Sequence, residues 1–272
     1  MKALIYFKKY YLVALAFMLF LAAFRISSNL NKPYIVISKQ DETWNLNDEM
    51  IQKFNLGFKR LESSFLWILT ILESDVDHYK KRDLNSWMFR RFNSISTLEP
   101  LFYENYTFGG LYLSIVKDDL SGASIIYDKG LKYYGDDFTL LRDAGFHFYF
   151  EVEDYKKAYE IYSKLKNHPK ASPIIISSLA RLEKSQGNPE AAFNLLINKY
   201  NQIPDKDSFL AQKIKGHLYA LKAELDLGCL NSSGENNQKC SLKDFNGDYY
   251  IKKNDTYQAI SPWEPLKIKR KK

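Results

Sequence analysis

Residues 178–204 read SLARLEKSQGNPEAAFNLLINKYNQIP, and this stretch decides the fold. Gly187 and Asn188 readily adopt the backbone angles of a sharp turn, and Pro189 suits the first turn of a helix. Ala192 lets two helix backbones approach closely, and Pro204 cannot continue a helix. The stretch therefore predicts a helix, a tight turn, a second helix and a stop.

The same pattern recurs upstream at a fixed period. The small residue of the second helix recurs at Ala123, Ala158 and Ala192, with spacings of 35 and 34 residues. The helix-stopping residues are Pro100, Gly135, Pro169 and Pro204, with spacings of 35, 34 and 35 residues. Because a fixed period of about 20 to 50 residues is typical of repeat folds, we expect a stack of helix pairs.

Four units follow this period. The fourth contains Leu179-Ala180, Gly187-Asn188, Ala192, Leu196 and Pro204; the third contains Ala144-Gly145, Phe148, Asp154-Tyr155, Ala158, Tyr162 and Pro169, with one extra residue between Gly145 and Ala158. The second contains Gly109-Gly110, Asp118-Asp119-Leu120, Ala123, Tyr127 and Gly135, and the first, from Ser64 to Pro100, contains Trp67 and Trp87-Met88. Over residues 60–228 the sequence resembles the tetratricopeptide repeat family, whose helix-turn-helix unit has about 34 residues. The resemblance implies an all-α fold, a right-handed solenoid of helix-turn-helix units.

The resemblance also implies where a partner would bind. In that family the first helices line a concave groove that takes an extended peptide or a partner helix, and the fold performs no chemistry. Carried over by register, with unit two counted back from Ala123, the groove residues are Phe108, Tyr112, Arg142, Phe146, Tyr149, Ser177 and Arg181. Counting unit two from Gly110 instead gives Thr107 and Leu111. The alternative is that the aromatic side chains belong to the core, where we place Phe148, Tyr155 and Tyr162.

The N-terminal residues have the pattern of a targeting or anchoring segment. Lys2, Lys8 and Lys9 precede an uncharged run over residues 10–24, and Arg25 ends it. The candidate cleavage points lack one of the two small residues that a cleavable signal requires. We expect residues 1–25 to form an uncleaved single-pass helix in an inner membrane, with a cleaved signal as the alternative. The bulk of the chain would then be exported to the periplasm.

The remaining boundaries follow from composition. Residues 26–46 are mostly polar and contain Pro33, which predicts a linker. Residues 47–228 form the predicted repeat domain, in which a helix near Met50 and Phe54 covers the first unit and a helix over 209–227 caps the last. Residues 229–272 are predicted to hold a disulfide loop, a small β-hairpin and a basic tail.

The two cysteines support export. Cys229 and Cys240 flank a polar loop, and in an oxidising compartment they should form a disulfide. The alternative is two free thiols in a reducing cytosol. A zinc site is disfavoured because His217 is the only nearby histidine and structural zinc takes four ligands.

Beyond Cys240 the pattern changes from helical to β-prone. The runs 249–251 and 256–260 flank residues 252–255, which predicts a hairpin. Just before it, Asp244, Gly247 and Tyr250 match the D-x-aromatic-G-x-x-Y element of type II secretion pseudopilins, with Asn246 in place of the aromatic residue. The stretch resembles that family, which binds calcium in this region. Asp244, Asn246 and Asp248 offer oxygen ligands at alternate positions, and the alternative is a turn before the hairpin.

The sequence offers little for catalysis. The histidines at 78, 147, 168 and 217 are scattered, and the cluster of Glu73, Asp75 and Asp77 predicts a hydrated turn rather than a metal site. The net charge of +7, with five basic residues among 267–272, permits contact with anionic lipid or another polyanion without requiring it. We expect no cofactor, no bound metal, no small-molecule substrate and no nucleic acid.

Together these patterns predict a membrane-anchored, exported repeat protein that acts as a scaffold or adaptor for other cell-envelope proteins through its concave face. The main alternative is a structural subunit of a secretion or pilus apparatus that works through the C-terminal hairpin. An enzyme and a cytoplasmic nucleic-acid binder are further alternatives. Binding by residues 60–228 alone would favour the adaptor, and binding that needs residues 240–272 would favour the subunit.

Overall fold

The computed structural model describes residues 15, 17–25, 53, 55–74, 86–232 and 240–268. The chain divides into two compact units, Met1–Glu42 and Thr43–Lys272. In the first unit, residues 17–25 are helical and their side chains are exposed. Within the described residues, no helix has both the length and the apolar character needed to cross a membrane. The predicted linker at 26–46 and most of the predicted covering helix lie outside the described residues.

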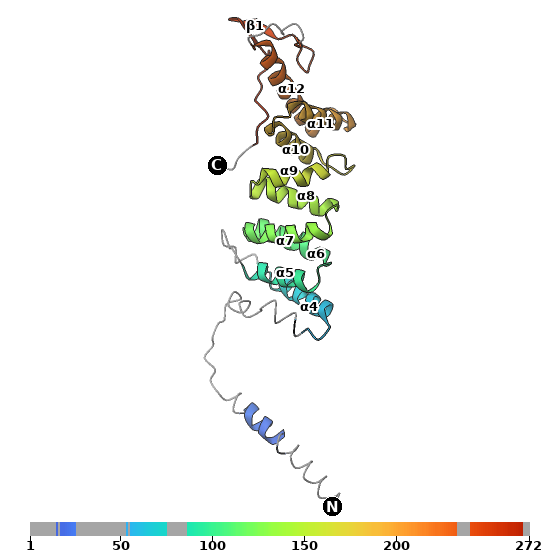
Figure 1. The fold of residues 1–272 in the computed structure, drawn as a ribbon, viewed down its shortest axis with the longest axis vertical. Helices are drawn as coiled ribbons and strands as arrows, with labels where there is room; N and C mark the ends of the chain where they lie inside the picture. Colours follow the sequence, from blue (N-terminus) through green and yellow to red (C-terminus); the bar gives the residue numbers. More distant parts are fainter. Residues whose placement is uncertain are drawn as a thin grey trace, which may run out of the picture. The chain divides into compact units, whose positions relative to one another are not determined.

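The second unit is mostly helical and ends in a short antiparallel hairpin, as predicted. Its helices are α4 (Lys59–Leu72), α5 (Trp87–Leu98), α6 (Tyr103–Leu111), α7 (Leu120–Tyr133), α8 (Phe138–Phe146), α9 (Tyr155–Lys164), α10 (Pro173–Ser185), α11 (Pro189–Gln202) and α12 (Phe209–Leu230). From α4 to α12 each helix packs against the next one in the chain (Figure 1). Alternate helices also touch, since α6 contacts α8 and α10 contacts α12.

The helices recur at the spacing that the sequence predicts. The helices α6, α8, α10 and α12 begin at residues 103, 138, 173 and 209, which are 35, 35 and 36 residues apart. The helices α7, α9 and α11 begin at 120, 155 and 189, with spacings of 35 and 34. The turn at Gly187 has φ +86°, and Pro189 starts α11. The predicted stop residues Pro100, Gly135, Pro169 and Pro204 all follow the ends of second helices.

Units two and three each accommodate one extra residue by a π-helical turn. These turns are η2 (Tyr112–Val116), which follows α6, and η3 (His147–Glu151), which follows α8. A π-helical turn places one more residue in the helix without breaking it. After each turn, Asp118 and Glu153 take positive φ angles of 53° and 60°, and the second helix then begins. The insertion between Gly145 and Ala158 therefore has a structural counterpart in both units.

The core lies between the paired helices. Ala123, Ala158 and Ala192 are fully buried, which agrees with the predicted close approach of helices at these positions. Phe148 and Tyr162 are buried in the main core, as predicted, and Tyr155 is partly buried against it. Most of the predicted apolar stripe of the last helix is also buried. Ile214, Leu218 and Leu221 of α12 are buried, Leu225 is partly buried and Leu210 is exposed.

A buried aspartate joins unit one to unit two. Asp119 caps α7 by accepting a hydrogen bond from the backbone N–H of Gly122 at 2.9 Å. Its other carboxylate oxygen accepts from the backbone N–H of Ser86 at 3.1 Å and lies 3.3 Å from the Ser86 hydroxyl. Ser86 in turn caps α5 through the N–H of Phe89. One fully buried carboxylate therefore fixes the starts of two helices.

A buried histidine joins unit two to unit three. His147 Nδ1 lies 2.8 Å from the Ser114 hydroxyl and Nε2 lies 2.9 Å from the Ser124 hydroxyl. Because the Ser124 hydroxyl donates to the carbonyl of Leu120, it accepts a hydrogen bond from Nε2–H, and the Ser114 hydroxyl donates to Nδ1. Burial lowers the pKa of His147 to about 4. A hydrogen bond to the backbone of Leu120 opposes this lowering, and the positive charge of Lys157 adds to it. The imidazole is therefore neutral at physiological pH.

The C-terminal region is tied to the end of α12. The Sγ atoms of Cys229 and Cys240 lie at disulfide-bonding distance, with their Cα atoms 5.8 Å apart, in agreement with the predicted pair. Strands β1 (Ile251–Lys253) and β2 (Thr256–Gln258) form the hairpin. Asn254 and Asp255 both have positive φ, as a two-residue turn of type I′ requires. The side chain of Asn231 bonds the backbone N–H and C=O of Tyr257 and so holds the hairpin to α12.

Candidate protein-binding surface

A cavity of about 690 Å³ opens beside α10 and α12. Its walls come from the end of unit three, from both helices and from the C-terminal segment 261–267, and they include Tyr149, Phe150, Ile174, Ser177, Ser178, Arg181, Leu210, Lys213, Lys215, His217, Pro262, Trp263, Glu264 and Leu266. This volume falls within the range of about 300 to 1,000 Å³ that is usual for ligand sites. We refer to these walls and the space between them as the α10–α12 cavity.

The helical period explains why these side chains share one face. On α10, Ile174, Ser177, Ser178 and Arg181 occupy positions i, i+3, i+4 and i+7, which lie on one side of a helix. On α12, Leu210, Lys213, Ile214 and His217 have the same spacing, and Gln212, Lys215 and Gly216 between them also line the cavity. The side chains of Ser172 and Ser208 cap the two helices and fix where each begins. The lining faces of α10 and α12 therefore begin at defined residues.

The guanidinium of Arg181 is the polar centre of the cavity. Nη1 donates to the carbonyl of Ser177 at 3.3 Å, and Nη2 donates to Nε2 of His217 at 3.1 Å. The hydroxyl of Tyr149 lies nearby, and burial raises its pKa, while the positive charge of Arg181 opposes that rise. No ion pair joins Arg181 to a carboxylate of the described residues. The two acceptors of the Arg181 guanidinium are a carbonyl oxygen and a ring nitrogen, and neither carries a negative charge.

The charges around the cavity are mainly positive. Arg181, Lys213, Lys215 and Lys267 line it, whereas Glu264 is the single acidic residue among the described residues of its walls. Arginine and lysine in a partly enclosed site attract carboxylates and phosphates, and arginine can bind a carboxylate through two parallel hydrogen bonds. The cavity therefore favours a ligand that carries an acidic group together with apolar surface for Phe150, Ile174 and Leu210.

The structure brings three of the seven predicted groove residues into this cavity. Tyr149, Ser177 and Arg181 line it, although Tyr149 and Ser177 are largely buried. Arg142 and Phe146 are exposed on α8, where Arg142 pairs with Asp143 at 2.7 Å. Whether any of these residues contacts a partner stays a prediction.

The other two predicted residues belong to an aromatic cluster near α4. The ring of Phe108 lies 5.4 Å from that of Trp67 and 5.5 Å from that of Tyr112. It also lies 6.3 Å from the ring of Phe92, which is fully buried. Phe108 itself remains 36% exposed, so the cluster forms one edge of the core rather than a wall of the cavity.

The observed period favours the second way of counting unit two. Thr107 and Leu111 lie 35 residues before Arg142 and Phe146, and Leu111 is exposed as Phe146 is. Counting back from Ala123 crosses the π-helical turn η2, and the extra residue there shifts the register by one. For this reason Phe108 and Tyr112 do not occupy the positions equivalent to Arg142 and Phe146.

The predicted set lacks the residues that α12 contributes. Lys213 and His217 lie 36 residues after Ser177 and Arg181, and they occupy the same positions in the next unit. The period itself identifies these positions, whereas the apolar stripe of residues 209–227 predicts only a cap for the stack. The wall formed by residues 261–267 had no comparable signal in the sequence.

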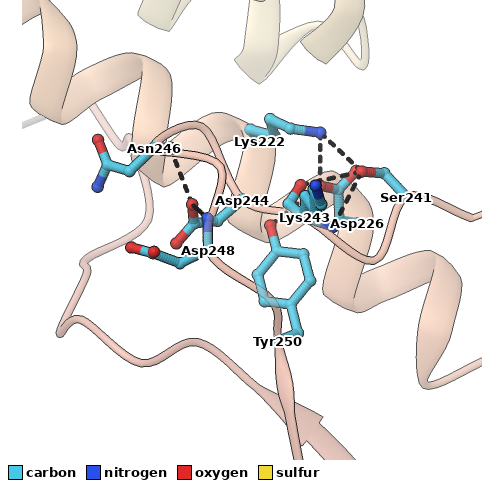
Figure 2. A network of polar contacts seen from close by, with 8 residues as sticks. All are labelled: Lys222, Asp226, Ser241, Lys243, Asp244, Asn246, Asp248 and Tyr250. Carbon is cyan, nitrogen blue, oxygen red and sulfur yellow. Dashed lines mark hydrogen bonds and ion pairs between the residues drawn. The ribbon is translucent and has the colours of Figure 1, made fainter.

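The loop before the hairpin uses the carboxylate of Asp244 to build a turn (Figure 2). Oδ1 of Asp244 accepts hydrogen bonds from the backbone N–H groups of Asn246 at 2.8 Å and Asp248 at 3.1 Å. Asp244 is largely buried, and Gly247 takes φ +94° to close the turn. This geometry matches the turn that the sequence offered as the alternative to a calcium loop. Across the described residues, no group of three or more histidine, cysteine or acidic side chains is placed to hold a metal ion.

A second polar group in Figure 2 fixes the loop on α12. Asp226 accepts from Nζ of Lys222 at 2.8 Å and from the hydroxyl of Tyr250 at 3.0 Å. Lys222 also donates to the hydroxyl of Ser241 at 3.1 Å. These contacts give the C-terminal region a defined position beside the α10–α12 cavity.

Comparisons with known proteins give no relative for this chain: no protein-family model, no curated protein and no solved structure matches it. The geometry of the α10–α12 cavity and the chemistry of its walls are therefore the basis for the function.

Proposed function

We propose that the protein is a helical-repeat scaffold or adaptor of the tetratricopeptide type, a right-handed solenoid, that binds a segment of another protein on the face formed by α10 and α12. The 35-residue period of the helices and the position of the cavity on alternate, equivalent helices support this proposal. The face offers apolar side chains and an arginine, the combination that dominates the energetics of many protein interfaces.

One observation carries the proposal. A stretch of the chain without helix or strand, residues 261–267, already forms one wall of the cavity. Leu266 in this stretch is only 5% exposed and belongs to the main core. A surface that holds an extended peptide of its own chain has the shape and the apolar contacts to hold one from a partner.

The cell envelope is the location that we propose, with residues 1–25 as membrane anchor. The paired Cys229 and Cys240 support an oxidising compartment, because disulfides persist there and are rare in a reducing cytosol. The partner would be another envelope protein.

Site-specific photocrosslinking in intact cells tests the proposed function. A photoreactive amino acid at Ile174, an exposed wall residue, should give an adduct with one defined protein. The same group at Glu160, exposed on α9 away from the cavity walls, is the matched control and should not give that adduct. Equal adducts from both positions, or none from Ile174, would contradict the proposal. An adduct formed only from Lys252 in the hairpin would favour the apparatus subunit instead.

A further inference from the structure

We infer that residues 261–268, the tail segment, are a built-in ligand of the face formed by α10 and α12, and that the partner is a protein segment with the same chemistry. That chemistry is an extended chain with an aliphatic anchor residue, as Leu266, and an acidic residue two positions before it, as Glu264. The partner must displace the tail segment to bind. This inference rests on the proposed function and specifies the partner of that surface.

The tail segment is held by side-chain anchors. Leu266 is buried in the main core, and Ile268 packs against the same core. Trp263, three residues earlier, packs instead on the smaller cluster that contains Ala223 and Leu230 of α12. The segment therefore runs along α12 from one apolar cluster to the other (Figure 1). In the sequence its anchors Trp263 and Leu266 stand on both sides of Glu264.

The backbone of the tail segment contributes little to this attachment. Its residues form no helix or strand, and it meets α12 at Ser261, where the Tyr219 hydroxyl donates to the Ser261 carbonyl at 3.4 Å and also contacts the Ser261 side chain. Pro262 and Pro265 lack backbone donors and fix φ, so they keep the segment extended before it binds and lower the entropy lost on binding. A segment attached by a few side chains can exchange with another of similar sequence without unfolding the helices.

The charges explain why an acidic residue should accompany the anchor. Glu264 is the acidic residue of the cavity walls, and the helices present Arg181, Lys213 and Lys215 around the same space. Glu264 is exposed, and a partner carboxylate near its position would be attracted by these cations. Anchor and carboxylate together distinguish the inferred partner from a purely apolar helix.

A tethered ligand competes effectively with a free one. A segment joined to its own site has an effective concentration in the millimolar range, so a weak contact is enough to keep it bound. If the site is open for about 1% of the time, a competing segment binds about 100-fold more weakly than to an empty site. Releasing the tail segment should therefore increase the affinity for a competitor.

The probe for this inference is a fluorescent peptide with the sequence of residues 259–268, AISPWEPLKI, titrated against the full-length protein by fluorescence anisotropy. The variant Leu266→Asn removes the anchor of the tail segment without adding a charge to the cationic cavity. We expect this variant to bind the peptide at least tenfold more tightly than the wild-type protein does. The matched control is Ile260→Asn, exposed just before the tail segment, which should bind like the wild type.

Two further measurements make the result decisive. Peptides with Leu266→Asn or Glu264→Gln should bind the released variant at least fivefold more weakly than the parent peptide. If Leu266→Asn loses its helical circular dichroism, Leu266→Ala replaces it, with an expected gain in peptide affinity of at least threefold.

Equal peptide affinity for wild type and released variant, or no binding by either, would overturn the inference. Loss of the photocrosslink from Ile174, whatever the peptide does, would overturn the proposed function instead.

Discussion

Gly145 on α8 lies directly against the aromatic ring of Tyr162 on α9. A Cβ atom added at Gly145 would stand 2.2 Å from Cε1 of that ring. The same relationship recurs 35 residues earlier, where a Cβ at Gly110 would stand 2.6 Å from Cε1 of Tyr127. Each glycine therefore makes room for a buried tyrosine of the second helix in its own unit.

Gly145→Ala should destabilise the protein by about 1 to 3 kcal/mol, because the added methyl group overfills this contact and the tyrosine ring is fully enclosed. Urea unfolding followed by circular dichroism measures the loss. The control is Gly216→Ala on α12, where the added Cβ would meet nothing within 4 Å. That substitution should stabilise by up to about 1 kcal/mol through helix propensity alone. A neutral Gly145→Ala would contradict the close contact.

Asp119→Ala should cost more than Asp154→Ala, although both residues cap the second helix of their unit. Asp154 is exposed and accepts from the N–H of Lys157 alone, so its loss should cost about 1 kcal/mol. Loss of Asp119 also leaves the buried N–H of Ser86 without its acceptor, which raises the expected cost to about 2 to 4 kcal/mol. Comparison of the two unfolding midpoints checks the difference. Equal costs would mean that Asp119 does not join the two helices.

His147 should make the stability depend on pH below neutrality. Its pKa is about 4 in the folded protein and about 6.5 when unfolded, so the unfolded chain binds more protons between these values. The contribution is complete above pH 6.5 and is lost as the pH falls toward 4, with about 2 kcal/mol lost between pH 7.5 and pH 5. Urea unfolding at the two pH values measures it. In His147→Gln the difference should shrink by this amount, and an unchanged difference would show that the imidazole is not buried as a neutral group.

Removing the link between Cys229 and Cys240 should cost somewhat less than about 3 kcal/mol, because the pair closes a short loop with a sequence separation of 11. The double variant Cys229→Ser/Cys240→Ser removes it without leaving a free thiol. Thermal unfolding should show a lower midpoint than for the wild type under oxidising conditions. In the presence of reductant, wild type and variant should unfold alike, and a persistent difference would contradict the assignment of the effect to the disulfide.

The sequence predicts the helices well because many of their boundaries have a local physical cause. Gly187 and Pro189 define the turn of unit four, and Asp119, Asp154 and Ser208 cap the starts of α7, α9 and α12. The positions of these residues repeat, so one well-defined unit predicts the others. The β-prone runs 249–251 and 256–260, which flank residues 252–255, predict the hairpin, and its turn is made by Asn254 and Asp255, which accept positive φ more readily than most residues.

Tertiary contacts determine what could not be predicted. The π-helical turns move the register of Phe108 and Tyr112 by one residue, and the sequence does not show which helix contains the extra residue. The return of residues 261–267 to α12 depends on where Trp263 and Leu266 find apolar partners, and no periodicity in the tail encodes that choice. The site is therefore only partly visible in the sequence, through Arg181 and its neighbours.

The central claim is that the face of α10 and α12 holds an extended segment, and a distance measurement in solution tests it most directly. Spin labels at Ile174 on α10 and at Lys267 in the tail segment lie on walls of the same cavity. Pulsed electron paramagnetic resonance on the full-length protein should give a single narrow, short distance, which becomes broad and longer in the Leu266→Asn background. A broad distribution in the protein with Leu266 intact, unchanged by the substitution, would contradict the claim.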